Sequence, residues 1–172
     1  MISPLVLAQS IFDTYKSNDK VTYVSISPQM FSMLAKLKIE DSDPEAKEFL
    51  ELITQIESFK LLRTVESSIS DHFSDWTQQY VETNNLFECM RVREESATVY
   101  FYAALSGQEE IVDQLVMLVQ DGWENNSTDQ PSQTVLLYIQ GKLDLTRIAS
   151  LVDKLDIPGA KELQKIKKQV KI

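Results

Sequence analysis

The sequence predicts an α+β fold, a two-layer sandwich in which a mainly antiparallel sheet of about six strands has helices packed on one face. Two observations lead to this prediction. Apolar residues recur at helical spacing through much of the first half of the chain, whereas four β-rich segments follow one another between residues 86 and 140. Consecutive strands of this kind are typical of α+β domains rather than of alternating βαβ units.

The first half of the chain contains strand and helix signals in turn. Ser27 and Pro28 form a helix start, with a serine in the capping position and a proline at the first helical residue. The helix that follows residue 66 has Phe73, Trp76 and Tyr80 on one stripe. In chain order, the expected elements are a strand at residues 21–27, helices at 28–37 and 44–57, a strand at 59–65 and a helix at 67–83.

The second half is predicted to be mostly sheet. The expected strands are residues 86–93, 97–105, 114–119 and 134–140. Gly141 is expected to end the last strand, and a helix is expected to start at Leu143–Asp144 and to stop before Pro158.

At 172 residues, the chain is predicted to form a single domain over residues 1–172. Residues 1–9 either are the remnant of a signal peptide or begin a helix, with Ser3 as the cap and Pro4 at the first helical position. Residues 160–172 form a basic tail that contains five lysines, of which Lys171 is the last. We expect that tail to be a solvated terminus.

Net charge argues against a nucleic-acid partner, and hydropathy argues against a transmembrane segment. The formal net charge is -9, which is the wrong sign for a general phosphate binder, so no nucleic-acid partner is expected. No stretch reaches the roughly 18 consecutive apolar residues that a membrane span needs, so no transmembrane segment is expected.

The residue types that build most catalytic sites are scarce. The chain has one histidine, His72, one cysteine, Cys89, and four glycines. A zinc site needs about four ligands, usually histidine or cysteine, and no G-x-S-x-G turn is present to hold a nucleophile. We therefore expect no catalytic residue, no metal and no cofactor, with His72 on a helix flank and Cys89 as a small buried side chain.

Three segments carry a resemblance to a known family. They are Val-Thr-Tyr-Val-Ser-Ile-Ser running into Pro-Gln-Met-Phe at residues 21–31, Phe-Glu-Cys-Met-Arg-Val at 87–92, and Tyr-Ile-Gln-Gly-Lys-Leu-Asp-Leu at 138–145. With these segments, the chain resembles the bacterial domain-of-unknown-function family 4252 from about Gln9 onward. The resemblance implies an exported, uncharacterised protein of the periplasm or cell envelope and no defined catalytic residue. A cytoplasmic location is the alternative, because a complete signal peptide is not present in the chain.

Strand alternation points to one candidate binding surface. If the purely apolar sets of each strand face the helices, the opposite face of the sheet collects tyrosines and arginines. Both residue types anchor protein interfaces, because each buries a large area and keeps a polar group. The predicted binding residues are Tyr23, Arg91, Arg93, Tyr100, Tyr102 and Tyr138.

The sequence thus favours a non-catalytic binding or scaffold module that meets a protein partner, or a second copy in a homodimer, through this face. The alternative is a small-ligand-binding protein or a hydrolase-like enzyme with a carboxylate, tyrosine and arginine site of unfamiliar pattern. A cleft of several hundred Å³ with convergent charges would favour the alternative.

Overall fold

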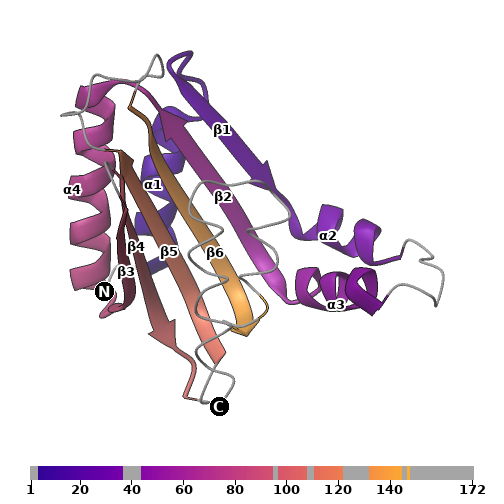
Figure 1. Cartoon of the computed structure of the whole chain (residues 1–172). Helices are drawn as coiled ribbons and strands as arrows, with labels where there is room; N and C mark the ends of the chain where they lie inside the picture. The colour runs from indigo at the N-terminus through magenta and orange to yellow at the C-terminus, as the bar shows by residue number, and fades with distance from the viewer. Residues whose placement is uncertain are drawn as a thin grey trace. The chain divides into compact units, whose positions relative to one another are not determined.

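The computed structural model describes residues 4–36, 44–94, 97–107, 111–121, 132–144 and 147 (Figure 1). Four helices and six strands lie in these ranges. They are α1 (Pro4–Tyr15), β1 (Val21–Ile26), α2 (Pro28–Ala35), α3 (Pro44–Ile53), β2 (Ile56–Thr64), α4 (Ser67–Thr83), β3 (Phe87–Glu94), β4 (Ala97–Leu105), β5 (Ile111–Asp121) and β6 (Thr134–Asp144).

The strands form one six-stranded antiparallel sheet in the order β1-β2-β6-β5-β4-β3. The predicted α+β class with about six strands is therefore confirmed. The helix start at Pro28 is also confirmed, because the Ser27 side chain accepts a hydrogen bond from the Met30 amide. No helix within the described ranges is both long enough and apolar enough to cross a membrane.

By its contacts the chain divides into two compact units. Unit 1 comprises residues 1–25, 60–104 and 115–138, and unit 2 comprises residues 26–59, 105–114 and 139–172. The single domain over residues 1–172 stays a prediction.

The core of unit 1 is an aromatic cluster between α1, α4 and the sheet. Phe12 of α1 lies edge-on to Trp76 of α4, with ring centroids 6.1 Å apart, and Trp76 stacks on Tyr80 at 4.8 Å. From the sheet, buried side chains such as Leu62 and Leu136 join the same cluster. Burying rings of this size supplies much of the hydrophobic stabilisation of so small a unit.

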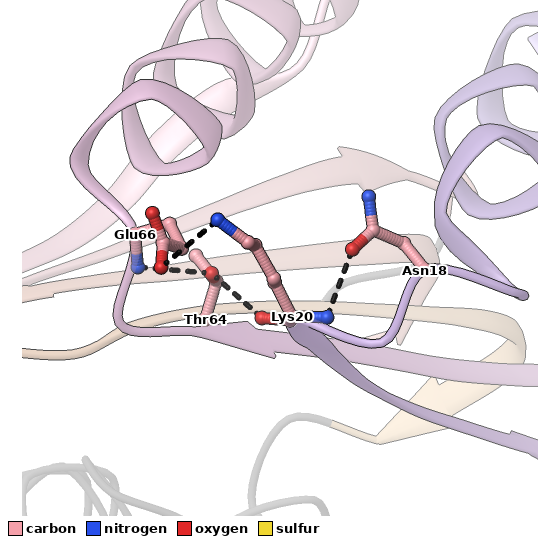
Figure 2. Close-up of polar contacts among 4 residues, drawn as sticks. All are labelled: Asn18, Lys20, Thr64 and Glu66. Atoms are coloured by element: carbon pink, nitrogen blue, oxygen red, sulfur yellow. Dashed lines mark hydrogen bonds and ion pairs between the residues drawn. The ribbon is translucent and has the colours of Figure 1, made fainter.

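A polar network fixes the two connections at the edge of unit 1 (Figure 2). The buried Thr64 hydroxyl donates to the Lys20 carbonyl at 3.1 Å and accepts from the Glu66 amide at 3.1 Å. Asn18 accepts from the Lys20 amide at 2.9 Å, and the Lys20 ammonium lies 3.5 Å from Glu66. One threonine therefore joins the start of β1 to the connection between β2 and α4.

Several element boundaries were predicted wrongly, and two of them lie in unit 2 and have a clear structural reason. The helix from residue 44 ends at Ile53 and not at 57, because β2 already begins at Ile56. Gly141 does not end the last strand, since β6 continues to Asp144. Gly141 has φ +149°, and a Cβ atom there would lie 2.1 Å from the Gln55 carbonyl oxygen. The glycine therefore permits a close backbone approach within a strand.

Apart from Arg147, the helix that was predicted after Asp144 lies outside the described residues, as does the basic tail at 160–172. At the other end, α1 begins at Pro4, where the sequence placed the first helical residue.

Candidate functional site

The tyrosines of the sheet face α1 and α4, so their predicted placement on an open face is wrong. Tyr138 is 2% exposed and lies between the helices, with its ring 6.2 Å from Phe12 and 6.0 Å from Tyr80. Tyr23, Tyr100 and Tyr102 are half-buried and pack against the same aromatic cluster.

The error has a physical cause. The prediction depends on the purely apolar side of each strand facing the helices, yet a tyrosine ring buries as well as a phenylalanine ring once its hydroxyl has a partner. The Tyr138 hydroxyl is hydrogen-bonded to Tyr80, and burial, followed by the interaction with Tyr138, raises the pKa of Tyr80. On the central strands, members of the purely apolar sets are buried too, as Phe101 at 1% and Leu137 at 0% exposure show. Both faces of the central strands therefore carry buried side chains.

A β-bulge in β3 decides which side chains meet at this edge of the sheet. The register with β4 pairs Glu88 with Tyr102 and Arg91 with Tyr100, and it shifts between Glu88 and Met90. Cys89 is thus the extra residue of the bulged strand. Without the bulge, residues 88 and 91 would point to opposite faces, and with it both share the face of their tyrosine partners.

These four residues, Glu88, Arg91, Tyr100 and Tyr102, form what we call the β3–β4 cluster. Arg91 donates two hydrogen bonds of 2.8 Å to the two carboxylate oxygens of Glu88. Its guanidinium lies 4.9 Å from the centroid of the Tyr100 ring. Tyr100 and Tyr102 are stacked, with centroids 6.2 Å apart and an interplanar angle of 5°. The side chain of Arg91 is 57% exposed. The cluster therefore presents to solvent a guanidinium group that lies over a tyrosine ring.

The protonation states of the β3–β4 cluster follow from its surroundings. Hydrogen bonding to the Glu88 carboxylate, and then its charge, raises the pKa of Arg91, which stays positively charged. Desolvation, and then the charge of Glu88, raises the pKa of Tyr102. The Tyr102 phenol is therefore protonated at neutral pH and can donate a hydrogen bond.

The other predicted binding residues are distributed unevenly. Arg93 is exposed on β3 opposite Thr98, on the same face as Arg91. Tyr23 is on β1, the opposite edge strand of the sheet, and so does not join the β3–β4 cluster. The structure thus brings Arg91, Tyr100 and Tyr102 together and leaves Tyr23 and Tyr138 apart from them.

A groove of about 260 Å³ lies between α4 and the β3–β4 cluster. Glu82 is the charged residue of its lining, and Val81 and Leu118 are apolar. One wall of the groove is braced by a hydrogen bond from the Gln120 amide to the Ser74 hydroxyl. The complete lining is Ser74, Thr77, Gln78, Val81, Glu82, Tyr100, Tyr102, Leu118 and Gln120.

The lone histidine and the lone cysteine lie outside the groove lining. His72 is on α4, and its Nδ1 lies 2.6 Å from the hydroxyl of Tyr15 on α1. Cys89 is exposed as a residue and not buried as predicted, but its thiol donates to the Phe101 carbonyl at 3.3 Å. Desolvation raises the pKa of that thiol to about 11, which keeps it protonated and unreactive at neutral pH. Within the described ranges, no group of three His, Cys, Asp or Glu side chains is placed to hold a metal ion.

Sequence reasoning missed Glu88, which holds Arg91, and the α4 residues that line the groove. A separation of three positions within a strand normally means opposite faces, and no glycine near Cys89 signals a bulge. The side of α4 that carries Ser74, Gln78 and Val81 reads as an ordinary polar helix flank until β4 is placed beside it.

The chain matches the family described as Domain of unknown function (DUF4252) over residues 15–151. No curated protein and no solved structure matches it. Because the match covers well over half of its length, the chain belongs to the DUF4252 family.

Proposed function

We propose that this protein is a non-catalytic binding module, and that it docks a partner protein on the β3–β4 cluster and the adjoining groove. The observation that carries the proposal is the arrangement of Arg91, which is exposed but already held in place by Glu88 and Tyr100. An arginine fixed in this way loses little side-chain entropy when a partner covers it.

The composition of the surface supports a protein partner. Tyrosine and arginine are enriched among the residues that dominate interface energies. Tyr100 and Tyr102 are half-buried, so their rings are fixed by the core while part of each remains accessible. A carboxylate on the partner would meet the guanidinium of Arg91, and an apolar side chain would fit between Val81 and Leu118.

A small ligand is the second candidate, because the groove exists. Its volume of about 260 Å³ lies slightly below the roughly 300–1,000 Å³ that is usual for small-molecule pockets. Glu82 is the charged residue of its lining, so the convergent charges that an acid–base site needs are not gathered there. These two features favour protein docking over a ligand-binding or hydrolytic role.

We also propose that the partner lies in the periplasm or cell envelope of a bacterium, as the family resemblance implies. The experiment is capture of partners by the immobilised chain from separate envelope and soluble extracts of the cells that produce it. Arg91→Ala is the test variant, and Arg63→Ala, which replaces an exposed arginine on β2, is the matched control.

We expect a partner that the wild type and Arg63→Ala retain and that Arg91→Ala loses. With the purified partner, Arg91→Ala should raise the Kd at least about tenfold. Arg91→Lys should recover little affinity, because lysine keeps the charge but not the planar, bidentate geometry. Equal capture by Arg91→Ala and Arg63→Ala would refute the proposal. A small molecule found on the wild type by native mass spectrometry, without a protein partner, would favour the second candidate.

A further inference from the structure

The two edges of the sheet differ in how they are protected against pairing with another strand. β1 and β3 occupy the two ends of the strand order. β3 carries Glu88, Arg91, Arg93 and Glu94 together with its bulge, all of which are features that discourage edge-to-edge association. β1 reads Val-Thr-Tyr-Val-Ser-Ile and contains no charge, no proline and no glycine.

The exposed face of β1 carries no charge, and its residues favour pairing with another strand. Val21 and Tyr23 turn toward the aromatic cluster, whereas Thr22 and Val24 alternate with them and are exposed, Val24 to 38%. Valine, threonine, tyrosine and isoleucine have high β propensity. β2 is the neighbour of β1, and no other strand within the described ranges pairs with the backbone amide and carbonyl groups on the other side of β1.

The start of β1 is also rigid. The network of Figure 2 ties Lys20 through its backbone to Asn18 and Thr64 and through its ammonium to Glu66. The ammonium group of Lys20, the residue that precedes the strand, is therefore already paired. An edge that is fixed before association loses less entropy when a second strand is added.

We propose that two copies of this chain pair along β1, antiparallel to each other, so that their sheets become continuous. The proposal does not rest on the β3–β4 cluster. In a two-fold arrangement one residue faces its own copy. In a register centred on Tyr23, Thr22 of one copy faces Val24 of the other. In a register centred on Val24, Tyr23 of one copy faces Ser25 of the other. Neither register sets like charges opposite each other within the strand.

Two copies paired along β3, the other edge strand, would bring like charges opposite each other. Pairing of β3 about Arg91 would place Arg91 opposite Arg91, and like charges directly opposite each other destabilise a strand pair. The pattern of charges thus selects a second copy at β1. Because each copy carries a net charge of -9, long-range repulsion opposes the dimer, and added salt should tighten it.

The test is sedimentation velocity of the full chain from about 1 to about 200 μM, at low and high salt. Val24→Lys sets two ammonium groups close together in the paired strands and should raise the dimer Kd at least about tenfold. Val65→Lys, at a valine 43% exposed on the connection between β2 and α4, makes the same change of charge elsewhere and should leave the Kd unchanged. Thermal unfolding of both variants checks that each is folded.

Amide hydrogen exchange locates the contact. Residues 21–25 should become more protected as the concentration rises in the wild type and in Val65→Lys, but not in Val24→Lys. A wild type that stays monomeric over the whole range would overturn the proposal. So would a Val24→Lys dimer as tight as that of Val65→Lys, or protection that rises elsewhere in the chain instead of in β1.

Discussion

Replacement of Thr64 by valine tests the network that joins β1 to α4. The two side chains have nearly the same shape, so the change removes one hydroxyl without leaving a cavity. That hydroxyl is 3.1 Å from both the Lys20 carbonyl and the Glu66 amide, in a residue only 2% exposed. At about 1 kcal/mol for each hydrogen bond lost, we expect a loss of about 2 kcal/mol in the free energy of unfolding.

For a chain of this length, such a loss corresponds to a fall in Tm of roughly 6 °C. The assay is urea unfolding followed by circular dichroism, combined with amide exchange at Glu66, which should accelerate. Thr64→Ser keeps the hydroxyl and loses a methyl group, so it should cost only about 1 kcal/mol. Thr83→Val makes the same change at an exposed threonine of α4 and should stay within about 0.5 kcal/mol of the wild type. If Thr64→Val is as stable as Thr64→Ser, the hydroxyl does not hold the two connections together.

Three further predictions concern the core, a backbone contact and the thiol. Tyr138→Ala should lower the free energy of unfolding in urea by about 4 kcal/mol, because the ring lies in the core. Tyr138→Phe should lower it by only about 1 kcal/mol, because only the hydrogen bond to Tyr80 is lost. A loss below about 1 kcal/mol in the alanine variant would show that the ring is not part of the core. Gly141→Ala should cost at least about 3 kcal/mol, since its Cβ would overlap the Gln55 carbonyl, whereas Gly107→Ala, also at positive φ but with nothing within 4 Å of the Cβ, should cost about 1 kcal/mol. Equal losses in these two variants would contradict the close approach. The Cys89 thiol, with its pKa raised to about 11, should react with iodoacetamide at pH 8 roughly a hundredfold more slowly than a free cysteine, and its rate should keep rising with pH as thiolate forms; a rate that levels off near pH 9 would show an ordinary thiol.

The element types were predictable because they depend on local signals. The bounds of α4 follow from its apolar stripe, and the start of α2 follows from Ser27 and Pro28. The strand β4 was predicted over its full length, because alternation and β propensity agree along it. These signals act over a few residues and need no knowledge of the partner elements.

The site was less predictable because it depends on long-range contacts. Nothing near Tyr138 in the sequence indicates that Phe12 and Tyr80 will enclose it. The same holds for the groove, because its two walls, Ser74 to Glu82 and Tyr100 to Gln120, come from separate parts of the sequence. Alternation grouped the tyrosines and arginines on one face, but the assumption that the purely apolar sets face the helices assigned that face to solvent. Tyr138 instead packs against Phe12 of α1 and Tyr80 of α4.

The extra residue at Cys89 has a consequence for how this edge of the protein can change. The ion pair between Glu88 and Arg91 exists because one residue too many interrupts the two-residue repeat of β3. A point substitution leaves the number of residues in β3 unchanged. Deletion of the single codon for Cys89 would instead move every side chain on one side of the bulge to the opposite face of the sheet. The ion pair between Glu88 and Arg91 would then be lost, although both residues would still be present in the sequence. The length of this strand, as much as its composition, therefore determines what the edge displays.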